Sequence, residues 1–114
     1  MRKSLNERLR EAAEALDWSW DESDGMVELE TWSPAGEDFV FSVPAKNVAD
    51  GVREFSRTFD TEEHVAELLE AKRNGFSGVP DVKTLVEDAD AIKEMLEDLA
   101  DAMEEARKSR RARR

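Results

Sequence analysis

The sequence predicts one small α+β domain: an N-terminal helix, a three-stranded antiparallel meander, then three helices of which the last is long. Apolar residues recur at helical spacing before residue 17 and after residue 47, and between these limits they alternate with polar residues. Turn-forming residues separate the segments. With 114 residues, 39% of them hydrophobic, the chain is long enough to bury one modest core.

The first helix is expected to begin at a capping box, in which Ser4 and Glu7 satisfy free amides of the first turn. Its apolar face then runs from Leu5 to Leu16. After Asp17 the apolar period changes to two, which predicts strands around Trp18–Trp20, Met26–Trp32 and Phe39–Val43. Turns are expected at 23–25 and 33–36 because Asp-Gly and Pro-Ala-Gly favour them.

Pro44 ends the third strand because it has no amide hydrogen to donate to a sheet. A helix from Val48 to Phe59 follows, although Gly51 weakens that prediction. The next helix begins near Asp60 with a second capping-box pattern and stops at Asn74-Gly75. Asp81 is expected to cap the last helix, at about residues 82–108. These elements form a domain over residues 1–106, followed by a basic tail, 107–114.

Charge is the most unusual property of the chain. It holds 28 Asp and Glu against 17 Lys and Arg, for a formal net charge of −11. Six basic residues fall within 107–114, so the body alone stands at −17. Such a body repels nucleic acid and anionic lipid and attracts basic protein surfaces, and it also favours solubility. Three roles are open for the basic tail. Its cations complement the dipole of the preceding helix, or they bind nucleic acid weakly, or they pair with the acids of a neighbouring subunit.

Two acidic surfaces are candidate partner-binding sites. The first is a stripe along the last helix, whose members recur every three or four residues: Glu87, Asp90, Glu94, Glu97, Asp101 and Glu104. Each step advances about 5 Å along the helix axis, which is near the spacing of phosphates along a nucleic-acid strand. The stripe is therefore either a solvated outer face or a mimic of nucleic-acid charge.

The second surface lies in residues 17–38, which contain no Lys or Arg. Trp18 and Trp20 are expected to share one face of a strand. The rings of Trp18, Trp20 and Trp32 are all expected to pack against the helices. The alternative is an exposed aromatic patch that also includes Trp32. Acids would surround such a patch, an arrangement found at protein interfaces. These acids are Asp21, Glu22, Glu28 and Glu30.

No motif indicates catalysis, a metal or a cofactor. His64 is the single histidine, and with Asp60 or Glu67 it supplies only two metal ligands. Residues 21–25 do not fit a calcium loop, since the first and twelfth positions lack carboxylates. Gly75-Phe76-Ser77-Gly78 is followed by Pro80 and Asp81, which disfavour a phosphate, so it is read as a turn. Cysteine is absent, and no segment is long and apolar enough to cross a membrane.

Three segments carry a resemblance to other proteins: residues 33–39, residues 63–75, and Gly78-Val79-Pro80 with residues 85–89. Together they resemble a group of short acidic uncharacterised proteins from plasmids and other mobile elements of gut bacteria. No activity is known for that group, so the resemblance assigns no functional residue. It implies an accessory or anti-defence role.

We therefore expect a non-enzymatic, cytoplasmic protein that binds a basic protein surface through its carboxylates. The most specific version is an inhibitor of a DNA-handling or defence protein, with the acidic stripe in place of phosphates. This version is favoured if the two acidic surfaces are contiguous in the fold. The alternative is a structural homodimer built on the apolar stripe of the last helix, with the charges serving solubility.

Overall fold

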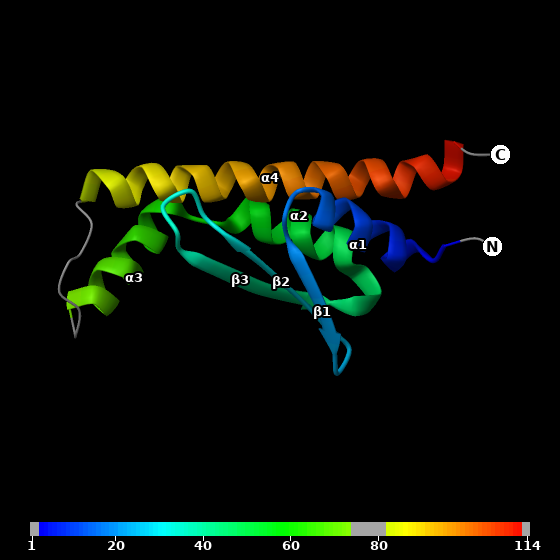
Figure 1. Cartoon of the computed structure of the whole chain (residues 1–114), viewed down its shortest axis with the longest axis horizontal. Coiled ribbons are helices and arrows are strands. Elements are labelled where there is room, and N and C mark those ends of the chain that lie inside the picture. The colour runs from blue at the N-terminus through cyan, green and yellow to red at the C-terminus, as the bar shows by residue number, and fades with distance from the viewer. Residues whose placement is uncertain (1–2, 74–81, 113–114) are drawn as a thin grey trace.

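The computed structural model describes residues 3–73 and 82–112 and confirms the predicted α+β fold (Figure 1). In order along the chain, its elements are α1 (Leu5–Ala15), β1 (Ser19–Ser23), β2 (Met26–Trp32), β3 (Asp38–Pro44), a 3-10 turn η1 (Ala45–Asn47), α2 (Val48–Thr58), α3 (Thr61–Arg73) and α4 (Val82–Ala112). The three strands form an antiparallel sheet in the order β1-β2-β3. The predicted stop at Asn74-Gly75, the turn at 75–78 and the cap at Asp81 lie outside the described residues.

Local signals in the sequence account for several of these boundaries. Ser4 accepts a hydrogen bond from the Glu7 amide at 3.1 Å, and the Glu7 carboxylate accepts from the Ser4 amide at 2.7 Å, which confirms the capping box. Asp60 caps α3 by accepting from the Glu63 amide at 3.1 Å. Asp24 and Gly25 both have positive φ, 53° and 77°, as the two central residues of a type I′ hairpin require.

One face of the sheet is buried under the helices. In β2 and β3 the buried side chains alternate with exposed ones, and the inward set is Val27, Leu29, Thr31, Phe39, Phe41 and Val43. The apolar members pack in one cluster with residues of α1, α2 and α4, including Leu9, Val52, Ile92 and Leu96. The opposite face of the sheet remains exposed. In Figure 1 it lies on the side of the molecule away from α4.

Gly51 lies where α2 comes closest to the sheet. A Cβ atom at this position would stand 2.9 Å from the Val43 Cβ, which is shorter than a van der Waals contact. The glycine that weakens the helix prediction is therefore the residue that permits α2 to pack this closely on β3. Phe55, one turn further along α2, stacks on Phe41 with ring centroids 4.3 Å apart.

The last helix is longer than expected, because it continues through the Arg-rich segment to Ala112 instead of ending near residue 108. Its 31 residues span about 46 Å. The apolar stripe packs within the same chain: Leu99, Ala100 and Met103 of its distal half are buried in the main core. Its N-terminal part packs on α3 through a smaller cluster of Val65, Leu85 and Ala89.

Candidate functional site: an acidic sheet face and the adjoining groove

The exposed face of the sheet carries both aromatic and acidic side chains. Strand pairing places Asp21 opposite Glu28, and Glu30 opposite Val40. At the end of the sheet Trp32 lies opposite Asp38 and is 66% exposed, while Val40 is 47% exposed. The three strands contain no Lys or Arg. Large apolar side chains are therefore accessible on this face, among acids that form no ion pair with a Lys or Arg of the described residues.

The tryptophans divide between the two faces. Trp18 is buried, with its ring at 5.7 Å from that of Phe41, and Trp20 is half-buried against the core. These two confirm the expected packing against the interior. The expectation was wrong for Trp32, because strand alternation places it on the exposed face of β2, beside the acids. Glu22 does not join them, because strand alternation places it on the same side as Trp20.

Two carboxyl groups of this face, those of Glu30 and Asp38, interact directly. Glu30 and Asp38 are diagonal neighbours across β2 and β3, so their side chains reach one another. A hydrogen bond with Asp38, and then the repulsion between the two charges, raise the pKa of Glu30 above its ordinary value of 4.5. The pair therefore retains a proton to higher pH than an isolated glutamate would. A cation placed beside it would relieve the same repulsion.

A groove of about 520 Å³ adjoins this face, between β3, α2 and α3. Its aromatic lining comes from both the sheet and the helices and consists of Phe39, Phe41, Phe55, Phe59 and His64. Its acidic lining comes from β3 with its preceding loop and from α3 with its cap, and consists of Glu37, Asp38, Asp60, Glu63 and Glu67. Among the described residues that line the groove, none is Lys or Arg. Asp38 and Val40 belong to both surfaces, so the groove and the sheet face are continuous.

The wall of the groove is held by His64 and Glu37. The His64 Nε2 atom lies 3.1 Å from a Glu37 carboxylate oxygen, and the two side chains are 14% and 22% exposed. The His64 ring also stands against Phe59 and Phe39, with centroid distances of 5.2 and 5.7 Å. The single histidine therefore joins α3 to the loop before β3 within an aromatic cluster.

Asp88 of α4 supports that loop from behind. It is buried and accepts hydrogen bonds from the Ser33 hydroxyl at 2.6 Å and from the Ala35 amide at 2.9 Å. Ser33 in turn accepts from the Glu37 amide at 2.9 Å. This chain of contacts connects the buried face of α4 with the groove.

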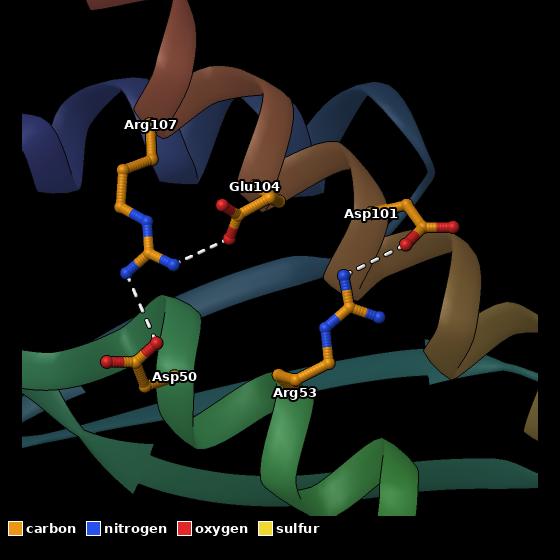
Figure 2. A network of polar contacts seen from close by, with 5 residues as sticks. All are labelled: Asp50, Arg53, Asp101, Glu104 and Arg107. Carbon is orange, nitrogen blue, oxygen red and sulfur yellow. Dashed lines mark hydrogen bonds and ion pairs between the residues drawn. The ribbon is translucent and has the colours of Figure 1, made fainter.

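The α4 stripe has a different environment, shown in Figure 2. Asp101 accepts from Arg53 of α2 at 2.9 Å, and Arg107 donates to both Asp50 and Glu104. These two hydrogen bonds, with Glu104 the stronger influence, raise the pKa of the Arg107 guanidinium. The described part of the chain offers no ion pair to the other four acids, which are exposed: Glu87, Asp90, Glu94 and Glu97.

The two predicted acidic surfaces are not contiguous. The sheet and α4 bury facing sides in the same core, so their exposed sides point away from one another. The condition that would favour one continuous nucleic-acid mimic is therefore not met. The groove residues were not among the predicted site residues, because they come from segments separated in sequence. The absence of Lys and Arg from residues 11–45 was the one available signal.

Within residues 3–73 and 82–112, no three His, Asp or Glu side chains are grouped so that they could hold a metal ion. None of the described helices is long and apolar enough to span a membrane. Comparison with protein-family models, curated proteins and solved structures gave no match. The resemblance to acidic proteins of mobile elements therefore stays a prediction.

Proposed function

We propose that this chain is a non-enzymatic protein-binding protein, which uses its carboxylates to bind a basic surface of another protein. One observation supports this most directly: the exposed sheet face places Trp32 among Glu28, Glu30 and Asp38, with no basic residue in its strands. Aromatic residues are enriched at protein interfaces, and unpaired acids favour a basic partner. A cytoplasmic location remains part of the same proposal.

The more specific proposal is that the partner is a DNA-handling or defence protein and that the chain is an inhibitor carried by a mobile element. The axial spacing of the stripe supports nucleic-acid mimicry. Asp101 and Glu104 weaken it, because they already bind Arg53 and Arg107 of the same chain. The sheet face is therefore better supported as a binding surface than the stripe, which we interpret as a solvated outer face of α4.

The alternative of a structural homodimer has less support. It requires apolar residues on the distal half of α4 to be available to a second copy. Leu99, Ala100 and Met103 are instead buried within one chain. Sedimentation at micromolar concentration tests it directly, and a monomer would contradict the dimer.

The proposed function is tested by affinity capture at low salt from a lysate of the native host, with two charge-matched variants. Glu28→Lys with Glu30→Lys alters the sheet face, and Asp90→Lys with Glu94→Lys alters the stripe. Each pair adds four charge units, so the net charge changes from −11 to −7 in both. We expect the sheet variant alone to lose a basic protein that the wild type retains, and that protein to elute with salt.

Two results would contradict this proposal. Retention of the same partner by the sheet variant and its loss from the stripe variant would assign binding to α4. Retention of no basic protein by the wild type at any salt concentration would contradict the function as a whole.

A further inference from the structure

The groove between β3, α2 and α3 combines two features that together favour one kind of ligand. Aromatic rings form its inner surface, and carboxylates line it with no Lys or Arg among the described lining residues. A metal ion does not suit it, since no three candidate ligands among the described residues are grouped for one. An anion does not suit it because the carboxylates would repel it. An organic cation with an apolar or planar body satisfies both features.

We propose that the groove binds an arginine side chain of the basic partner, with its guanidinium against the aromatic rings and its N–H groups directed to the carboxylates. This inference rests on the proposed function and deepens it. It adds a specific anchor to a surface that would otherwise attract any basic protein.

The guanidinium fits better than the ammonium of lysine. It is planar, less strongly hydrated, and stacks on aromatic rings while its edge donates to carboxylates. Glu63 and Glu67 lie one turn apart on α3 and are both exposed, and Asp38 lies on the β3 side. Donors along one guanidinium edge can therefore meet acceptors from two walls.

The size of the groove also fits an arginine that belongs to a longer segment. Its volume of about 520 Å³ exceeds that of one side chain. It lies within the range of roughly 300–1,000 Å³ found for ligand sites. Because Asp38 and Val40 continue onto the sheet face, residues next to the arginine would reach Trp32 and Glu30.

His64 and Glu37 form the rigid part of this site. Each is mostly buried, and their contact at 3.1 Å joins α3 to the loop that Asp88 holds. We assign them the role of positioning residues that fix the distance between the walls. The accessible acceptors are Glu63, Glu67 and Asp38.

The test uses NMR titration of the full chain with three capped pentapeptides that contain one arginine, one lysine or one citrulline among glycines. Citrulline keeps the planar shape of arginine without its charge. We expect the arginine peptide to shift resonances of His64, Thr58 and Phe59, the lysine peptide to bind several-fold more weakly, and the citrulline peptide not to bind.

The matched variants separate the groove from general charge. Glu63→Gln with Glu67→Gln should weaken binding of the arginine peptide about tenfold, since it removes two exposed ion pairs. Asp90→Asn with Glu94→Gln removes two exposed acids at the same helical spacing from α4 and should leave the Kd unchanged. Both pairs are exposed, so both variants are expected to fold.

Three outcomes would overturn the inference. Equal binding of the citrulline peptide would show that charge is not recognised. Equal weakening by the α4 variant would show attraction to net charge alone. The third outcome is that the full chain self-associates and thereby displaces the peptide, while a chain lacking residues 107–114 is monomeric. This result would assign the groove to the tail of a second copy.

Failure of this inference is distinguishable from failure of the proposed function. If the arginine peptide does not bind but a captured basic protein still requires Glu28 and Glu30, the sheet face is the interface and the groove inference is wrong. If the peptide binds and no basic protein is ever retained, the groove recognises guanidinium and the proposed function is wrong.

Discussion

The two acidic regions of this molecule have similar charge and different surroundings. On α4, Asp101 and Glu104 are bound to Arg53 and Arg107, while the other stripe acids stand in open solvent. At the groove, five carboxylates lie around aromatic rings on a concave surface. We infer from this comparison that the number and spacing of acids are not enough to identify a binding surface, and that the surroundings of each acid must also be considered.

Solvent explains the difference in physical terms. A carboxylate on a convex helix surface is screened by water and salt, and an ion pair there is worth only about 0–1 kcal/mol. A carboxylate beside an aromatic wall acts on a cation that has lost part of its water, where attraction is stronger. We therefore expect the groove to bind a cation more strongly than the stripe does, although the stripe contains more acids than either wall.

The largest expected effect comes from the residue that connects the two regions. Asp88→Ala removes the buried carboxylate of α4 and leaves the Ser33 hydroxyl and the Ala35 amide without their acceptor. We expect a loss of about 2–4 kcal/mol in the free energy of unfolding, measured by urea denaturation.

Asp90→Ala is the control, because Asp90 is exposed two residues away on the same helix. It should change stability by less than about 0.5 kcal/mol. Equal stability of the two variants would mean that the loop does not depend on α4. The His64–Glu37 contact should also loosen in Asp88→Ala, visible as a shift of the His64 ring resonances.

The second effect concerns the close packing of α2 on β3, the two elements that supply Phe55 and Phe41 to the groove. Gly51→Ala places a Cβ 2.9 Å from that of Val43, so α2 must move away from β3. The intrinsic helix preference of Ala favours the variant by about 1 kcal/mol. Overpacking costs about 1–3 kcal/mol, and we expect a net loss of stability measured by thermal unfolding.

The outcome of Gly51→Ala also bears on the groove. Phe55 follows Gly51 on α2 and stacks on Phe41, so displacement of α2 should alter the ring contacts inside it. Glu54→Ala, at an exposed position of the same helix, is the control and should leave those aromatic resonances in place. A stabilised Gly51→Ala variant would show that the approach of α2 to β3 is not tight.

The sequence predicted the elements of the fold better than the candidate site. Each element follows from signals within a short segment, such as the capping box at Ser4 or the alternation through β3. The last helix extends four residues past the expected end near 108, since residues 107–112 contain no helix breaker. Asp88 lies beside the apolar stripe of α4, and periodicity did not reveal its role because its partners lie more than 50 residues away in the sequence.

The groove could not be predicted from the sequence for the same reason as the role of Asp88. Its acids come from the loop before β3, from the cap of α3 and from α3 itself, and only packing of α2 and α3 beside the sheet brings them together. Periodicity along one element identifies a stripe, as it did on α4, but it cannot join carboxylates from separate elements. The α4 stripe was therefore the more visible pattern in the sequence, although the groove is the better supported site.

A smaller effect follows from freeing the paired acids of the stripe. Arg53→Gln with Arg107→Gln removes the partners of Asp101 and Glu104, at a cost of less than about 1 kcal/mol for each exposed ion pair. High salt should reduce this cost. The six stripe acids would then have no ion-pair partner among the described residues, yet we expect the arginine peptide still to perturb only groove resonances. New shifts along α4 would show that unpaired charge is sufficient.

The smallest effect lies in the Glu30–Asp38 pair of the sheet face. Because the folded-state pKa of Glu30 is raised, its contribution to stability is fully present below its unfolded pKa and is lost as the pH rises through the folded pKa. Between these two pKa values the Tm of the wild type should decline as the pH rises, and Glu30→Gln should make this decline smaller. Asp38→Asn breaks the same pair from the other side and should act similarly.

A double variant decides whether this effect belongs to the pair. If the two carboxyl groups act on one another, Glu30→Gln with Asp38→Asn should flatten the Tm profile no more than either single change. Additive effects would indicate that each group responds to the general negative charge of the face. The arginine peptide supplies a second readout, because a guanidinium beside Asp38 should reduce the repulsion and release a proton from Glu30. Proton release that is seen in the wild type and absent from Glu30→Gln would connect the sheet face and the groove as one cation-binding surface.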